Sequence, residues 1–132
     1  MLAIAAALNF TTRRKVLVFS ETKAIVQALP AESLAANLVE PVQGSAGCRL
    51  ATKEFLHYLL LSADNQKCLL IIDEVMTSRL DPNGCSAATG IKADLMSLGK
   101  YVGDGMTFGA FGGRRDIMEV FDPEISGLQS TS

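Results

Sequence analysis

Tryptophan is absent from the sequence, and aromatic residues make up only 6% of its 132 residues. A platform on which nucleic-acid bases could stack is therefore not expected. His57 is the single histidine, which argues against a metal site built on imidazole and against a Ser-His-Asp triad. Cys48, Cys68 and Cys85 are odd in number and widely spaced, which fits neither a zinc site nor a disulfide framework. We expect buried, reduced thiols at these three positions.

Long apolar runs and a strong charge of one sign are also missing. The formal net charge is -2, and basic residues cluster only at 13–15 and 114–115, so we expect no basic face for a nucleic acid. The apolar run at 1–10 has no basic residue before it, unlike a secretory signal peptide. No run approaches the roughly 20 apolar residues that span a bilayer. We therefore expect a cytoplasmic protein without nucleic-acid or membrane partners.

The apolar fraction of 48% and the charged fraction of 20% are ordinary for one globular domain. Short apolar or β-branched runs, typical of strands, alternate with segments of helical periodicity. This alternation favours an α/β fold with a mostly parallel sheet and flanking helices. We predict strands at 15–19, 34–39, 68–72, 94–98 and 107–111, helices at 2–10, 21–29, 53–63 and 114–121, a turn at 64–67 and an irregular segment at 78–92.

Two of these strands lead into ionisable side chains. Asp73 follows the strand at 68–72, and Lys100 follows the strand at 94–98 after Gly99. Groups at the carboxyl ends of parallel strands converge on one crevice, where ligands bind. Taken alone, each residue has a purely structural explanation. Lys100 would be a surface lysine, and Asp73 would be an acid that caps the following turn. Together they match pyridoxal-phosphate chemistry, which needs a lysine amine for a Schiff base and a carboxylate at the protonated pyridine nitrogen.

A glycine-rich loop follows Lys100, with Gly103, Gly105 and Gly109 spaced as G-x-G-x-x-x-G. This spacing allows a second interpretation, a dinucleotide-binding loop. Such a loop is expected to follow a strand and to open a helix, whereas this one precedes a predicted strand. We keep it as an alternative.

Four segments carry a family resemblance: EPVQGSAGC at 40–48, LLIIDEVMT at 69–77, DLMSLGK at 94–100 and GAFGGRRDIMEVF at 109–121. In this order and spacing they resemble the class III aminotransferases, pyridoxal-phosphate enzymes of the aspartate-aminotransferase fold (fold type I). The resemblance is strongest to the glutamate-1-semialdehyde 2,1-aminomutase group and its amino-acid transaminase relatives. It covers about residues 34–121 and, more weakly, 2–19.

The resemblance implies a pyridoxal 5'-phosphate site, in which Lys100 forms the Schiff base and later moves protons between substrate and cofactor. Asp73 would pair with the pyridine nitrogen, Val75 would pack on one ring face, and Met76 would lie near the ring hydroxyl. The implied activity is that of a transaminase or aminomutase, acting on an amino acid or amino-aldehyde, with a homodimer in full-length members. The implied cofactor-binding residues are Glu40, Gln43, Asp73, Val75, Met76 and Lys100.

The sequence also departs from the family pattern. A long insert that carries the ring-stacking aromatic residue is missing after Ser20, and the turn that binds the phosphate would precede residue 1. Asp104 replaces a glycine and Thr107 a proline of the glycine-rich loop. We therefore expect residues 1–132 to be part of the large domain, without the small C-terminal domain. The alternative function is a catalytically inactive remnant with an incomplete cofactor site, marginally stable unless a partner covers its apolar faces.

Overall fold

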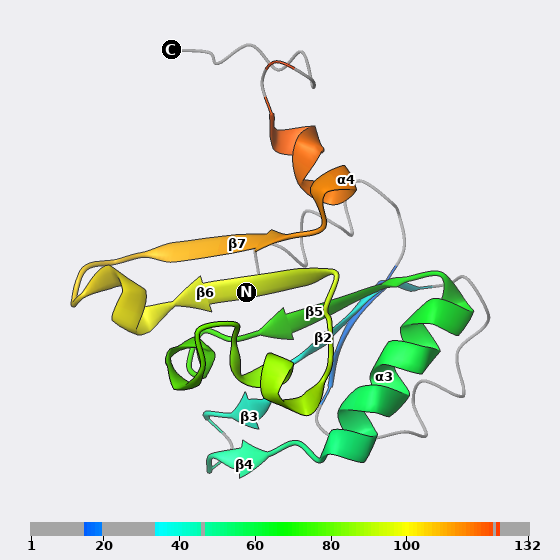
Figure 1. Ribbon diagram of the computed structural model, residues 1–132, viewed down its shortest axis with the longest axis horizontal. Coiled ribbons are helices and arrows are strands. Elements are labelled where there is room, and N and C mark those ends of the chain that lie inside the picture. The colour runs from blue at the N-terminus through cyan, green and yellow to red at the C-terminus, as the bar shows by residue number, and fades with distance from the viewer. Residues whose placement is uncertain (1–14, 20–33, 46, 123, 125–132) are drawn as a thin grey trace.

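The computed structural model of the chain describes residues 15–19 (backbone only), 34–45, 47–122 and 124 (Figure 1). A five-stranded sheet with the order β1-β2-β5-β6-β7 forms its centre. The pairs β1·β2, β2·β5 and β5·β6 are parallel, and β6·β7 is antiparallel. The predicted α/β fold with a mostly parallel sheet is confirmed. The strands are β1 Lys15–Phe19, β2 Leu34–Val39, β5 Leu69–Asp73, β6 Leu95–Gly99 and β7 Gly109–Gly113.

The middle of this sheet is buried on both faces and is apolar except for Asn37. Every residue of β2 is buried, and so are Leu70, Ile71 and Ile72 of β5. Continuous apolar runs of this kind suit parallel strands, which are covered on both sides. This explains why strands at these positions could be predicted from composition alone.

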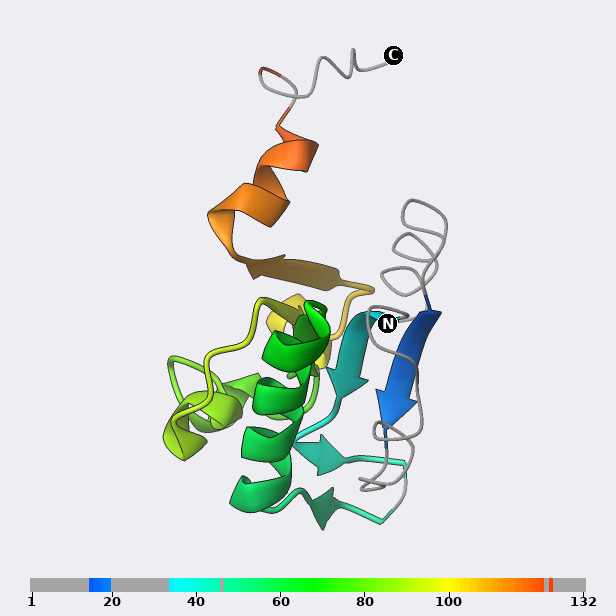
Figure 2. The same cartoon turned by 90° about the vertical axis from the view of Figure 1, so that its right-hand side faces the viewer.

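Helix α3, Lys53–Gln66, covers one face of the sheet over β2 and β5 (Figure 2). Thr52 caps it, because its hydroxyl oxygen accepts a hydrogen bond from the Phe55 amide at 3.1 Å. The buried stripe of the helix packs with Val39, Leu70 and Ile72 from the strands. That stripe consists of Phe55, Leu56, Leu59 and Ala63.

The predicted turn at 64–67 is wrong for its first three residues, because α3 continues to Gln66. Asp64 and Asn65 are exposed, so their polar side chains stay in contact with water when the helix continues. The helix ends at Lys67, which adopts a left-handed conformation with φ 52°.

Fewer of the described residues cover the other face of the sheet. Ala36, Leu38, Ile71 and Leu95 form its buried cluster, with Ile117 and Met118 packed against it. The last two belong to α4, Arg115–Met118, a short helix followed by the 3-10 turn η4, Glu119–Phe121. The single helix predicted at 114–121 is therefore split into these two elements.

The strand predicted at 107–111 lies two residues further on, as β7. It runs antiparallel to β6, from Gly99↔Gly109 to Leu95↔Gly113. At its end Gly113 has φ 158°, and a Cβ there would lie 2.0 Å from the Asp94 carbonyl oxygen. A glycine is needed for this close approach. The preceding loop leads into β7 and opens no helix, which removes the support for a dinucleotide-binding loop.

Shorter elements connect the strands. A two-stranded hairpin, β3 Val42–Gln43 and β4 Arg49–Leu50, follows β2. The 3-10 segments η1 Ser78–Leu80 and η2 Cys85–Thr89 fill the predicted irregular region, and η3 Lys100–Gly103 follows β6. The helices predicted at 2–10 and 21–29 lie outside the described residues. Within the described part, no helix is long and apolar enough to cross a membrane.

The expectation of buried thiols is wrong. Cys48 is exposed, and Cys68 and Cys85 are half-buried, while all three are free of disulfides. The position of Cys48 explains its exposure, because it lies in the turn of the β3–β4 hairpin. Among the described residues, no three His, Cys, Asp or Glu side chains are grouped so as to hold a metal ion.

Candidate active site

Asp73 is the last residue of β5 and lies beside β6, in register with Ser97. Its Oδ1 atom accepts hydrogen bonds from Ser97 Oγ at 2.8 Å and from the Val75 amide at 3.0 Å. Its Oδ2 atom accepts no hydrogen bond from the residues that the structure describes. The described residues therefore fix the carboxylate through one oxygen and leave the other without a hydrogen bond from them.

Lys100 lies at the same edge of the sheet, directly after β6. Its side chain is exposed, and its backbone is left-handed with φ 52°. This conformation is strained for a residue other than glycine, by about 1–3 kcal/mol, and such strain occurs often at functional sites. Lys100 follows Ser97 by three residues, which corresponds to about 10 Å of extended chain. The acid and the amine thus lie at the ends of neighbouring strands.

The space beside Asp73 is shaped by Gly99 and Val75. A Cβ atom on Gly99 would lie 3.3 Å from Cγ1 of Val75 and 3.4 Å from the Phe108 carbonyl oxygen. Only a residue without a side chain lets Val75 pack this closely on the end of β6. The half-buried Val75 side chain consequently forms an apolar surface next to the Asp73 carboxylate.

The β3–β4 hairpin contacts the turn that follows Asp73. A Cβ on Gly44 would lie 2.0 Å from the sulfur of Met76, so the Met76 side chain packs directly on the Gly44 backbone. Glu40 orders this loop, because its Oε2 atom accepts a hydrogen bond from the Gly44 amide at 3.1 Å. Gln43, in β3, is half-buried. Glu40, Gln43 and Met76 are thereby brought into one loop assembly beside the strand ends.

The sequence analysis missed Glu74, which is completely buried. Its carboxylate accepts hydrogen bonds from the Thr77 hydroxyl, from the Cys85 amide at 3.1 Å and from the Ser86 amide at 2.7 Å. The available signal was an acidic pair directly after a buried strand. Because successive strand residues alternate in direction, Asp73 and Glu74 leave the sheet on opposite faces.

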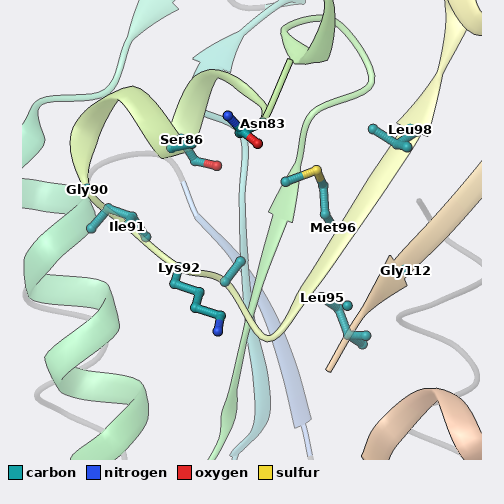
Figure 3. A pocket seen from close by; sticks show the side chains of 12 residues that line it. Asn83, Ser86, Gly90, Ile91, Lys92, Leu95, Met96, Leu98 and Gly112 are labelled. Carbon is teal, nitrogen blue, oxygen red and sulfur yellow. The ribbon is translucent and has the colours of Figure 1, made fainter. Parts of the chain in front are cut away.

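A groove of about 620 Å³ runs along β6 on the face that also carries α3 (Figure 3). Met96 and Leu98 line it, and Ser97 between them belongs to the opposite face, with Asp73. The groove is therefore separate from the Asp73 carboxylate. Its lining is mainly apolar, with Asn83, Ser86 and Lys92 as polar residues.

The arrangement can support a definite chemistry. A carboxylate with one unbonded oxygen can hold a protonated ring nitrogen, which donates the hydrogen bond. A primary amine at the next strand end can bond to a carbonyl carbon. Both residues lie at the carboxyl edge of the parallel strands, which is where α/β folds bind their ligands.

Comparison with known proteins gives a consistent result. The family model of class-III aminotransferases matches residues 3–131. Two curated relatives are a β-phenylalanine transaminase from Variovorax paradoxus and a glutamate-1-semialdehyde 2,1-aminomutase from Methanopyrus kandleri. The first is 40% identical over 159 residues, which cover 97% of this chain and 37% of the relative. The second is 42% identical over 109 residues, which cover 80% and 25%. The chain thus spans about a quarter to two fifths of these relatives.

Solved structures agree. The β-phenylalanine aminotransferase from Variovorax paradoxus has a TM-score of 0.76 at 41% identity, covering 93% of this chain and 36% of the other. An ω-transaminase from Sphaerobacter thermophilus has a TM-score of 0.73 at 25% identity, covering 93% and 40%. A third similar structure, a transaminase with PLP bound, has a TM-score of 0.68 at 36% identity, covering 76% of this chain and 24% of the other.

Proposed function

This chain belongs to the class-III aminotransferase family, and from that premise we propose that it carries the core of a pyridoxal-phosphate-dependent transaminase site. One observation supports this most directly. The Asp73 carboxylate is fixed through Oδ1 and open at Oδ2, and it lies at the same sheet edge as Lys100. An acid and an amine so placed are the two groups that pyridoxal phosphate requires from a protein.

The residues present fit this cofactor. The unbonded Oδ2 atom of Asp73 suits the protonated nitrogen of the pyridine ring, and Val75 offers an apolar surface for a ring face. When bound, pyridoxal phosphate supplies an aldehyde carbon for the amino group and a ring that withdraws electrons from that position. Lys100 would hold the cofactor through its Nζ amine and would be the group that takes and returns protons beside it. Glu40, Gln43 and Met76 order the loop beside the ring.

We infer that the amino donor is an amino acid. An aromatic β-amino acid is the first candidate, because the relative named for β-phenylalanine matches 97% of this chain. An amino-aldehyde is the second candidate, since the aminomutase is 42% identical over 80% of the chain. Both donors present an amino group next to a carbon whose proton Lys100 can take.

A second copy of the chain is the proposed partner. Several large apolar side chains between residues 101 and 121 are exposed, and we call them the apolar patch. Large apolar side chains that are exposed in this way often belong to protein interfaces. Phe121 also stacks edge-to-face on Phe111, with ring centroids 5.2 Å apart. The apolar patch consists of Tyr101, Val102, Met106, Phe108, Phe111, Val120 and Phe121.

An amino-transfer assay tests the proposal. With pyridoxal phosphate in excess, the chain should transfer the amino group of β-phenylalanine to a 2-oxo acid. Replacing Lys100 with alanine should lower the rate about a thousandfold or more, because the attacking amine is removed. The matched control is Lys92→Ala, which removes an exposed lysine of the groove and should leave the rate unchanged.

Two outcomes would contradict this function. One is the absence of transfer from the β-amino acid, from α-amino acids and from an amino-aldehyde alike. The other is an equal rate for the original chain and Lys100→Ala.

A further inference from the structure

Glu74 is a buried charged group for which the proposed chemistry has no direct use. Its side chain has no exposed surface, and burying an unpaired carboxylate would be costly. Both oxygens are occupied: Oε1 by the Ser86 amide at 2.7 Å, and Oε2 by the Cys85 amide at 3.1 Å and the Thr77 hydroxyl. A charge this deeply buried and fully bonded requires a structural or functional reason.

The hydrogen bonds of Glu74 connect two segments that are distant in sequence. One segment is the turn 74–78, where the Glu74 carbonyl oxygen accepts from the Thr77 and Ser78 amides at 3.0 and 2.9 Å. The other segment is 84–86, at the start of η2. Gly84 has φ 87°, and a Cβ there would lie 3.0 Å from Glu74 Oε1. The backbone of this segment therefore closes directly onto the carboxylate.

The segment 84–86 also rests against the sheet. A Cβ on Gly84 would lie 3.0 Å from Cε of Met96, whose side chain lies near Ser86 and Asn83 at one end of the groove (Figure 3). The Glu74 amide in turn donates to the Ser97 carbonyl oxygen at 3.1 Å. Ser97 is the residue whose hydroxyl holds the Asp73 carboxylate at 2.8 Å. The end of β5 is thus fixed from both faces of the sheet.

We propose that Glu74 is a positioning residue, which holds Asp73 and Val75 in the geometry of the site by binding the segment 84–86 to the end of β5. The inference rests on the proposed function, because it names Asp73 as the partner of the ring nitrogen. Without the carboxylate, the turn after Asp73 loses its hydrogen bonds to the segment 84–86 and keeps only its backbone hydrogen bonds. The Val75 amide, which donates to Asp73 Oδ1 at 3.0 Å, then no longer has a fixed position.

The negative charge is necessary for this role. A glutamine has one acceptor oxygen, so it can serve either the Cys85 amide or the Ser86 amide but not both, since its NH2 group is a donor. Glu74 also acts on its neighbour Cys85. The pKa of the Cys85 thiol is raised by burial first, then by the negative charges of Glu74 and Asp81.

Amide exchange followed by NMR tests the role without any ligand. In Glu74→Gln, exchange of the Val75 amide should become about tenfold faster, a size expected for loss of one buried hydrogen bond to a charged group. Amides in the middle of α3 should exchange at their original rates. The matched control is Glu54→Gln, the same substitution at an exposed position of α3, which should leave the Val75 amide unchanged.

The affinity for pyridoxal phosphate then tests whether the hydrogen bonds of Glu74 affect the site. In Glu74→Gln the affinity for pyridoxal phosphate, measured by its absorbance, should fall about tenfold, because Asp73 is less well placed to hold the ring nitrogen. The pH profile of the bound cofactor's absorbance should shift as well, which a loss of stability alone would not cause. If Glu74→Gln does not fold, Thr77→Val provides the test, with about a threefold effect in the same direction.

The outcomes separate the two proposals. A folded Glu74→Gln with unchanged Val75 exchange overturns the positioning role, whatever the cofactor does. Faster Val75 exchange with unchanged affinity and pH profile also overturns it. If the original chain binds no pyridoxal phosphate, the proposed function fails, and the exchange measurement alone decides whether Glu74 holds the turn.

Discussion

The two halves of the described chain differ sharply in packing. In the first half, β2 is completely buried, and α3 and β5 contribute a shared core around Leu59, Leu70 and Ile72. In the second half, no side chain between residues 100 and 122 is buried. Asp73 lies at the end of the packed strand β5, whereas Lys100 begins the exposed segment 100–122. The packed strands therefore hold Asp73 in place, whereas Lys100 lies in an exposed turn with a left-handed backbone.

This difference shows which part of the site the chain builds by itself. The Asp73 carboxylate is held by Ser97 and Val75 and, behind the sheet, by the bonds of Glu74. Around Lys100, the apolar side chains of Tyr101 and Val102 face solvent. A cofactor or a second copy of the chain is expected to order this half, because burial of apolar surface is the main source of stability.

The largest expected effect tests the packed half with a matched pair in α3. Leu59 is 0% exposed and Leu61 is 62% exposed. Leu59→Ala should lower the free energy of unfolding by about 2–5 kcal/mol, through lost burial and a cavity. Leu61→Ala should change it by no more than about 0.5 kcal/mol. Urea unfolding followed by circular dichroism measures both, and equal losses would show that the two positions do not differ in packing.

A smaller effect tests the exposed half. Met106 is 81% exposed within the apolar patch, and Met106→Lys would place like charges across a symmetric interface. Self-association, measured by analytical ultracentrifugation, should weaken about tenfold. The control is Leu80→Lys, at an exposed leucine outside the patch, and it should have no effect. A chain that stays monomeric at every concentration would remove the patch from the proposed interface.

The smallest effect concerns the junction between β7 and α4. Arg114 binds both oxygens of Asp116, at 3.1 and 2.5 Å, and also Asp94 at 2.8 Å. The hydrogen bond from Arg114 is the main reason that the pKa of Asp116 lies below its ordinary value of 3.8. A lowered folded pKa means that this pair stabilises the chain fully above about pH 4, and that the contribution disappears as pH falls through the folded pKa.

Melting curves of the original chain and of Asp116→Asn check this pH dependence. The original chain should melt slightly higher at pH 7, and the difference should vanish well below pH 3.8. The gain is small because the pair is exposed and screened by solvent. A difference that grows towards acid pH would contradict the assignment.

The strands and the two principal site residues could be predicted, because their signals are local. The runs at 34–39 and 69–73 are short and apolar, and Asp73 and Lys100 follow strands directly. The continuation of α3 through Asp64 was not predicted, because the polar run at 64–67 is also typical of a turn.

Glu74 shows what local signals cannot supply. Its backbone donors, Cys85 and Ser86, lie 11 and 12 residues away, in a segment of 3-10 turns without periodicity. No sequence pattern indicates that this segment folds back onto the strand end. The antiparallel direction of β7 could not be predicted either. A glycine-rich strand has no alternation of apolar and polar residues that would distinguish parallel from antiparallel pairing.

The most direct test of the account is covalent trapping of the cofactor. The original chain is incubated with pyridoxal phosphate, reduced with borohydride, digested and examined by mass spectrometry. The account predicts one pyridoxyl-modified lysine, Lys100, and a strong decrease in its labelling in Asp73→Asn, whereas Lys92 stays unmodified. Equal labelling of Lys92 and Lys100, or labelling that does not depend on Asp73, would contradict a site built at these two strand ends.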